Sequence, residues 1–241
     1  MTTRRTALAL LLAAPGTALA CRNGALGTAR MLPVPSAGGP QFGLKSYDAT
    51  LPLADGEVVL TFDDGPVPGL TDRVLTTLAH ECVHATFFLI GRNAAASPHL
   101  VRRMVAEGHT VANHTMTHPW TLRNLGHDAA WENILAGERM LASIVGAAVA
   151  PFFRFPGFAD TPRLLDALSQ ANRAVLGADF WASDWNSMAP AEQLQLVMSR
   201  LRRARKGIVL FHDTRPQTVA MLPMFLDTLK REGFRIAHMV G

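Results

Sequence analysis

Short apolar runs alternate with amphipathic stretches of helical spacing throughout residues 51–241. Residues 58–62 form one such run, and the stretch 67–81 that follows repeats apolar side chains at helical spacing. Repeated strand–helix units are typical of parallel strands joined by right-handed crossovers. Seven predicted strands suit a barrel-like closure better than a small open sheet, so the pattern predicts an α/β fold.

The predicted strands are 58–62, 85–90, 109–113, 151–155, 174–178, 207–211 and 234–239. The predicted helices are 67–81, 98–107, 122–145, 161–171, 191–205 and 217–232. In a barrel of parallel strands, chemistry collects where the strands end and the loops begin. The residues that directly follow these strands are therefore the first candidates for a functional site.

Residues 1–20 have the layout of a signal peptide. Arg4 and Arg5 precede an unbroken Ala/Leu stretch at 7–14, and Ala18-Leu19-Ala20 forms an A-x-A cleavage site. The paired arginines also fit a twin-arginine signal, so both export routes stay open. Either route predicts a mature chain that is periplasmic or secreted.

The segment at 21–50 is rich in Gly, Pro, Ala and Ser and has little periodicity, which predicts a flexible tether. Cys21 directly follows the cleavage site, so a lipid anchor on this cysteine is a second possibility. One folded domain is expected over 51–241, with no second domain. No apolar run reaches the roughly 18 residues that a membrane span needs.

The net charge of +4 comes from the N-terminal part of the chain. Residues 1–47 hold five basic residues and no acidic one, so the remainder carries one more acid than base. The pI of about 9.7 therefore does not indicate a nucleic-acid partner. One local basic run is expected at the solvated C-terminal end of a helix; it comprises Arg200, Arg202, Arg203, Arg205 and Lys206.

Two strand ends carry residues with metal-binding and acid–base chemistry. Asp63 and Asp64 close the strand at 58–62, and the Gly65-Pro66 turn that follows fixes their directions. His114 and His118 follow the strand at 109–113 and can face one point from one tight loop. One carboxylate and two imidazoles leave a coordination position open, which is the arrangement of a catalytic metal site.

Three further strand ends deliver ionisable side chains. Arg154 lies among phenylalanines, where a buried guanidinium requires a partner. Asp184 follows the strand at 174–178, and His212 follows the strand at 207–211. Because five predicted strand ends carry ionisable side chains, His212 is expected to have a function rather than to be only a buried histidine of the core.

These segments resemble the polysaccharide deacetylase family, the NodB-type domain of carbohydrate esterase family four. The five matching motifs read Thr61-Phe-Asp-Asp-Gly-Pro66, His114-Thr-Met-Thr-His118, Arg154-Phe-Pro156, Asp184-Trp185 and Leu210-Phe-His212. The resemblance covers about residues 55–240. Two motifs depart from the family pattern: Gly157 comes one place early after Pro156, and the fourth motif lacks the second Asp or Asn that often opens it.

The resemblance implies a distorted (β/α) barrel that removes N-acetyl groups from an N-acetylglucosamine-containing polysaccharide or oligosaccharide. It implies a divalent metal, commonly zinc and alternatively cobalt, nickel or manganese, held by Asp64, His114 and His118. Asp63 would be the base and His212 the acid, with Arg154 holding Asp63 and Asp184 tuning His212. The substrate groove would include Pro156, Gly157, Phe158, Trp185 and Leu210.

Two other hypotheses about function are compatible with the sequence. The domain could hydrolyse other bonds, such as the O-acetyl esters of xylan or small cyclic amides. It could also bind sugars without catalysis, although the presence of both Asp63 and His212 argues against that. Neither the polymer, whether chitin-like or peptidoglycan, nor the oligomeric state follows from the residues.

Overall fold

The computed structural model describes residues 21–241, so the predicted signal peptide at 1–20 lies outside the described residues. Ten strands occur in the described part: β1 Thr28–Pro33, β2 Gln41–Phe42, β3 Glu57–Asp63, β4 Thr86–Leu89, β5 Thr110–Asn113, β6 Val149–Phe153, β7 Ala174–Leu176, β8 Phe180–Trp181, β9 Gly207–His212 and β10 Arg235–Val240. The α-helices there are α1 Thr71–His80, α2 Gly91–Ala96, α3 Pro98–Ala106, α4 His127–Val145, α5 Pro162–Gln170, α6 Pro190–Ala204 and α7 Pro216–Arg231.

All seven predicted strands and all six predicted helices are confirmed, with ends that shift by a few residues. The predicted helix at 122–145 is interrupted, since a single 3-10 turn at Leu122–Asn124 precedes α4. Strands β2 and β8 have only two residues each, which is too short for a periodicity signal. Helix α2 was also not predicted, because its sequence Gly-Arg-Asn-Ala-Ala-Ala has no apolar stripe.

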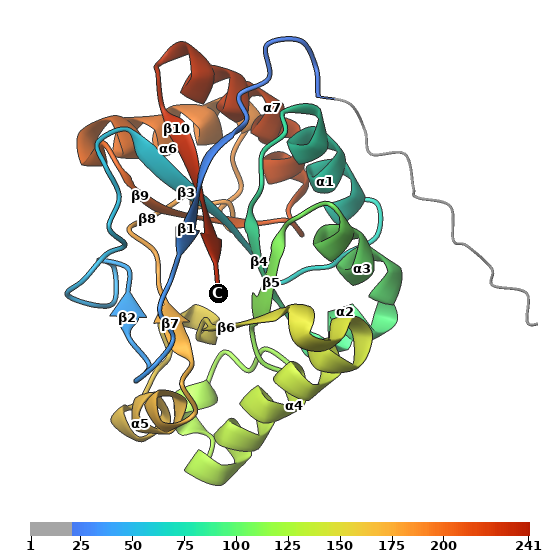
Figure 1. The fold of residues 1–241 in the computed structure, drawn as a ribbon, viewed down its shortest axis with the longest axis vertical. Helices are drawn as coiled ribbons and strands as arrows, with labels where there is room; N and C mark the ends of the chain where they lie inside the picture. The colour runs from blue at the N-terminus through green and yellow to red at the C-terminus, as the bar shows by residue number, and fades with distance from the viewer. Residues whose placement is uncertain (1–20) are drawn as a thin grey trace, which may run out of the picture.

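The strands form one parallel sheet around β3. Their order is β1-β10-β3-β4-β5-β6-β7-β2, and β9 pairs with β3 and with β8. Strand β9 occupies one edge of β3, from Val58 to Asp63. Two strands share the other edge: β10 pairs with the beginning of β3, and β4 pairs with its end. The β1–β10 pair therefore diverges from the rest of the sheet, and it runs across the front of the molecule in Figure 1.

The segment 174–182 closes the barrel. Its first part, β7, pairs with β6, and its last part, β8, pairs with β9. One stretch of chain thus pairs first with β6 and then with β9, and so links the two sides of the barrel. The predicted barrel-like closure is confirmed, in the distorted form that such a change of partner produces.

Side chains alternate between two apolar layers along the central strands. Val58, Leu60 and Phe62 of β3 pack outward in the layer shared with α1, α3, α6 and α7. Val59 points the other way, into the barrel interior, where it packs with Phe88 of β4. This period of two is the ordinary alternation of a strand that is buried on both faces. Helices α4 and α5 cover a third cluster against β6 and β7.

The flexible tether predicted over 21–50 is wrong. Strand β1 pairs with β10 over most of its length, and β2 pairs with β7. Leu32 and Val34 are 4% exposed and pack into the barrel-interior cluster. The pairing was missed because only one residue of β1 is fully buried, so the strand lacks a long apolar run.

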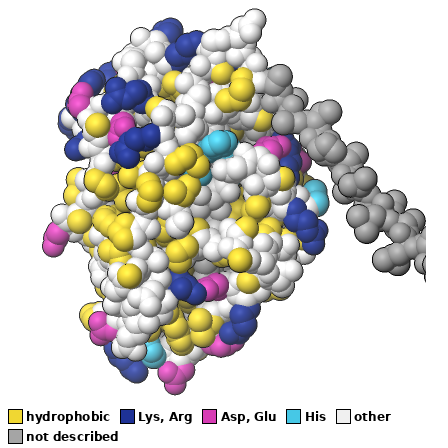
Figure 2. Space-filling model, in the orientation of Figure 1, with side chains coloured by type: hydrophobic (Ala, Val, Ile, Leu, Met, Phe, Trp, Pro, Cys, Tyr) yellow, Lys and Arg dark blue, Asp and Glu magenta, His cyan; other side chains and the backbone are white. Residues whose placement is uncertain are grey.

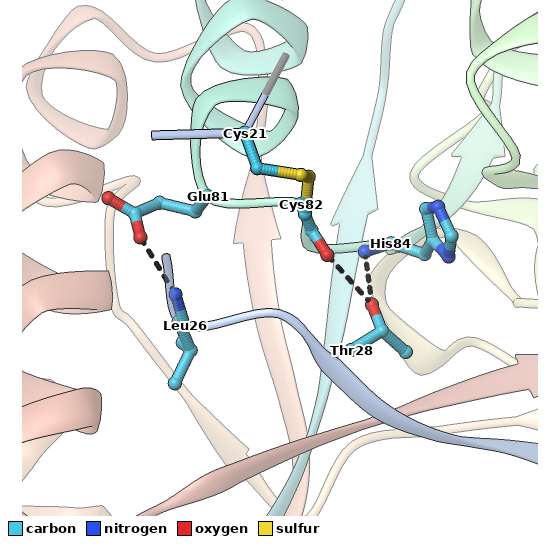
Figure 3. The surroundings of a disulfide bond; sticks show 6 residues. All are labelled: Cys21, Leu26, Thr28, Glu81, Cys82 and His84. Carbon is cyan, nitrogen blue, oxygen red and sulfur yellow. Dashed lines mark hydrogen bonds between the residues drawn. A yellow bond between two sulfur atoms is a disulfide. The ribbon is translucent and has the colours of Figure 1, made fainter. Parts of the chain in front are cut away.

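A disulfide joins Cys21, at the start of this N-terminal segment, to Cys82 (Figure 3). Nearby, the Leu26 amide donates to Glu81 and the Thr28 hydroxyl donates to the Cys82 carbonyl, while the His84 amide donates to Thr28. The Cys21 sulfur is therefore used within the fold. This pairing replaces the alternative of a lipid anchor on Cys21, because both need the same sulfur atom.

The basic run occupies the C-terminal end of α6, as predicted. Arg202 pairs with Glu232 and Arg205 with Asp55. Figure 2 shows lysines and arginines mixed with acidic side chains over this end of the molecule. The run is a solvated helix end rather than a continuous basic surface. No helix among the described residues is both long and apolar enough to cross a membrane.

Strand β1 provides a direct test of the N-terminal segment as part of the fold. Replacing Leu32 by Ala should lower the free energy of unfolding by about 2–5 kcal/mol, because it leaves a cavity in the barrel interior. The neighbouring Met31 is 49% exposed, so Met31→Ala should change it by less than about 0.5 kcal/mol. Urea unfolding of the two variants measures both values, and equal effects would mean that β1 does not pack as described.

Candidate active site

The alternation of the strands brings the predicted site residues into the barrel. Asp63 is in phase with the inward-facing Val59, and His212 is in phase with the inward-facing Ile208. His114 follows Ala112 and Arg154 follows Phe152 at the same two-residue interval. All four side chains therefore point to the same end of the barrel interior, where the strands end.

Asp64, His114 and His118 meet at one point. Each offers one ligand atom, and the three atoms lie within 4.8 Å of one another. His118 Nε2 is 3.2 Å and His114 Nε2 is 3.6 Å from Asp64 Oδ1. That oxygen is buried and has no hydrogen-bond partner among the described residues. A buried oxygen without a donor, facing two imidazole nitrogens, fits a divalent cation.

The backbone around these ligands adopts an unusual conformation. Asp64 has a φ of 78° and His118 a φ of 55°, a region that non-glycine residues enter at a cost of about 1–3 kcal/mol. Gly65 is required beside Asp64, because a Cβ at this position would lie 2.1 Å from Asp213 Oδ2. The strained turn directs Asp64 toward the histidines while Asp63 stays in the strand.

The ring of His114 is oriented by Arg154. His114 Nδ1 lies 2.8 Å from the Arg154 carbonyl oxygen, which can only accept, so Nδ1 carries the proton. The lone pair on Nε2 then faces Asp64. Burial lowers the pKa of His114 to about 3, against the opposing charge of Asp64. The imidazole is therefore neutral at physiological pH, as a metal ligand must be.

Arg154 is completely buried and forms an ion pair with Asp63. Its Nη1 donates to Asp63 Oδ1 at 2.7 Å and to Thr61 Oγ1 at 2.8 Å. Nε and Nη2 donate to the carbonyls of Leu176 and Gly177. Burial raises the pKa of the Asp63 carboxyl, and the charge and hydrogen bond of Arg154 oppose that rise. The second oxygen, Oδ2, faces His114 Nε2 at 3.8 Å.

His212 and Asp184 form a second buried pair. His212 Nδ1 donates to Asp184 Oδ1 at 2.7 Å, while the His212 amide and the Thr218 hydroxyl donate to Oδ2. Burial lowers the pKa of His212, but the hydrogen bond and charge of Asp184 outweigh burial and raise it to about 9. His212 Nε2 is left facing the metal-ligand group, 3.9 Å from Asp64 Oδ2.

A cavity of about 320 Å³ opens over these groups. Of the five residues predicted for the substrate groove, Gly157, Phe158, Trp185 and Leu210 line it. Pro156 does not line it: this residue is buried at the start of a 3-10 turn that positions Gly157 and Phe158. The prediction for Pro156 is therefore corrected to a supporting position.

Four lining residues were not predicted from the sequence: Trp120, Phe155, Trp181 and Arg215. Trp120 is 67% exposed, and its ring packs edge-on against His118 with centroids 4.7 Å apart. Trp181 stacks on Phe158 and meets Trp185 edge-on. Each of the four lies within three residues of a predicted site residue: His118, Arg154, Asp184 or His212. This closeness was the available signal, although it does not say which neighbours face the cavity.

Comparison with known proteins gives the family. The sequence model described as polysaccharide deacetylase matches residues 51–176, about half of the chain. The chain belongs to the polysaccharide deacetylase family. A chitooligosaccharide deacetylase from Bradyrhizobium sp. (strain ANU 289) is 39% identical over 194 residues, which cover 74% of this chain and 87% of that protein.

Two solved structures of this family resemble the chain closely. The Bdellovibrio bacteriovorus peptidoglycan deacetylase Bd3279 has a TM-score of 0.81 at 27% identity, covering 94% of this chain and 64% of that one. The Bc1960 peptidoglycan N-acetylglucosamine deacetylase has a TM-score of 0.72 at 30% identity, covering 78% of this chain and 88% of that one. The match to the Bdellovibrio protein covers a larger share of this chain than residues 51–241 make up. It therefore includes part of the N-terminal segment.

The His212–Asp184 pair makes a prediction for titration. In Asp184→Asn the ring loses its negative partner, so burial should dominate and lower the pKa of His212 from about 9 toward or below its ordinary value. NMR titration of the His212 ring in both proteins measures this shift. Thr218→Val removes a neighbouring hydrogen bond but keeps the charge, so its shift should be much smaller. Equal pKa values in wild type and Asp184→Asn would contradict the assignment.

Proposed function

We propose that this chain is a metal-dependent hydrolase that removes acetyl groups from N-acetylglucosamine units of a chitin-like or peptidoglycan glycan. The observation that carries the proposal is the convergence of Asp64, His114 and His118 beside two separate ion pairs, Asp63–Arg154 and His212–Asp184. The relatives are named for acetyl removal from chitooligosaccharides and from peptidoglycan N-acetylglucosamine.

The proposed ligands are Asp64, His114 and His118, and the proposed metal is Zn²⁺, with Co²⁺, Ni²⁺ or Mn²⁺ as alternatives. Two imidazole nitrogens and one carboxylate suit these ions and leave coordination positions open. When bound, such an ion would polarise the acetyl carbonyl and lower the pKa of a water molecule.

Asp63 is the proposed base. Its Oδ1 is held by Arg154, and its Oδ2 faces the cavity side near His114. Burial raises the pKa of the Asp63 carboxyl, which makes the carboxylate a stronger acceptor for a proton from water. The ion pair fixes the side chain so that only one oxygen is free to act.

His212 is the proposed acid. The amine that leaves when an amide is cleaved needs a proton, and His212 with a pKa of about 9 carries one at neutral pH. Asp184 holds Nδ1, so the proton available for transfer is on Nε2, which faces the metal-ligand group. Activity should therefore be lost as the pH rises through the pKa of this pair.

The carbonyl oxygen that becomes negative needs a donor, and the Gly157 amide is the proposed one. Phe158 already donates its amide to the Phe155 carbonyl at 3.0 Å. Gly157 lines the cavity, so its amide can approach the substrate without a side chain intervening.

The direct test is acetate release from N-acetylated chito-oligomers, with and without a chelator. Release should stop with the chelator and return when Zn²⁺ is added back. Release from O-acetylated xylan alone would support the esterase alternative, and sugar binding without any release would support a non-catalytic domain.

Two variants separate metal binding from proton transfer. His118→Ala should lose metal by elemental analysis of the purified protein. Asp63→Asn should keep the metal and lose about 10²–10⁴-fold in turnover, the usual contribution of a general base. Near-wild-type turnover of metal-loaded Asp63→Asn would rule out Asp63 as the base. His80→Ala, a substitution outside the cavity, is the control and should keep both metal and turnover.

Export of the mature chain is also proposed. Its support is the signal-like sequence at 1–20 and the Cys21–Cys82 disulfide, a bond typical of oxidising compartments. N-terminal sequencing of exported protein should begin at Cys21, and mass spectrometry should find no fatty acid on it. Exported protein that retains Met1 would contradict cleavage.

A further inference from the structure

The cavity wall holds a basic side chain that no acidic residue neutralises. Arg215 lines the cavity together with His212 and Trp185. Within residues 21–241, no carboxylate oxygen lies within 4.0 Å of its guanidinium, and its Nε is buried without a hydrogen-bond partner. A buried donor without a partner costs about 1–3 kcal/mol, so this position favours a ligand that can accept from it.

The backbone fixes Arg215 on the same rim as the proposed acid. The Arg215 amide donates to the His212 carbonyl, and the Arg215 carbonyl accepts from Val219 in the first turn of α7. Pro216 begins α7 and restricts the chain directly after Arg215. The side chain therefore starts from a rigid turn three residues beyond His212, in the wall of the same cavity.

Two more basic side chains touch residues of the same cavity. Lys45 Nζ lies 5.4 Å from the centre of the Trp181 ring, and Arg123 Nη2 donates to the Phe158 carbonyl at 3.3 Å. Neither forms an ion pair within the described residues, whereas surface arginines such as Arg173 and Arg202 do pair with carboxylates. Three separate segments of the chain thus place a basic side chain in the cavity wall or beside one of its lining residues.

Building on the proposed function, we propose that Arg215 binds a carboxylate of the substrate. The site would then prefer a glycan in which the sugar beside the reacting N-acetylglucosamine carries a free carboxylate. The glycan strand of peptidoglycan has this chemistry where its lactyl carboxyl bears no peptide, and a neutral chito-oligomer lacks it. A guanidinium donates two parallel hydrogen bonds to a carboxylate, a geometry that a lysine cannot reproduce.

The alternative role for Arg215 is contact with the acetyl group or the released acetate. In that case it would act on every N-acetylated substrate alike. The two roles differ in one measurable quantity, which is the ratio of kcat/KM between a carboxylate-bearing glycan and the same glycan with that charge removed.

The test uses a matched pair of substrates and the metal-loaded, full-length mature protein. One substrate is a peptide-free tetrasaccharide that alternates N-acetylglucosamine and N-acetylmuramic acid, and the other is the same molecule with its carboxylates converted to primary amides. Wild type should favour the carboxylate form about tenfold in kcat/KM, the scale of one charge-assisted hydrogen bond at a partly exposed site. This preference should weaken between about 50 mM and 500 mM salt, because screening increases.

Arg215→Gln should bring the ratio close to one, and Arg215→Lys should restore part of it. Arg102 is exposed on α3 outside the cavity, so Arg102→Gln should keep the wild-type ratio. A wild-type ratio near one would overturn the inference, as would an Arg215→Gln variant that slows both substrates equally. If neither form nor chitotetraose releases acetate, the proposed deacetylase function fails as well.

Discussion

The buried guanidinium of Arg154 is the interaction on which the site depends. It is fully inaccessible to solvent, and its nitrogens donate to Asp63, to Thr61 and to two carbonyls of the segment that closes the barrel. Its own carbonyl accepts from His114. Arg154, which directly follows β6, thereby connects β3, β7 and the loop after β5. Removing one partner of such a buried pair costs about 3–5 kcal/mol, because it leaves an uncompensated charge.

The N-terminal segment contributes to the same closure. Asp179 lies between β7 and β8, and its carboxylate accepts from the Leu44 amide, the Thr50 hydroxyl and the Ile208 amide. The Lys45 amide donates to the Ala178 carbonyl beside it. The stretch of chain that changes partner between β6 and β9 is therefore fastened on one side by Arg154 and on the other by the segment that follows β1.

Strand periodicity accounts for how much the sequence could predict. Each strand alternates with period two, so residues that follow an inward-facing side chain by two or four positions must also point inward. That rule places Asp63, Arg154 and His212 together without knowledge of any contact. The rule does not say where a loop residue points, and β1 has too few buried side chains for the alternation to be recognised in its sequence. The paired N-terminal segment, the Cys21–Cys82 disulfide and the cavity wall at Trp120 therefore required the structure.

Gly157, the early glycine of the third motif, lies directly beside Trp120 in the cavity wall. Gly157 has a φ of 55°, and a Cβ added there would lie 3.3 Å from Cε3 of Trp120. The Trp120 ring thus occupies space beside position 157 while it also packs against the metal-site residue His118. A side chain at position 157 would require the indole to shift slightly, and loss of the indole would remove the ring that lies against the glycine. The two positions therefore form one surface, built from loops that follow different strands, and the departure at 157 has to be considered together with Trp120.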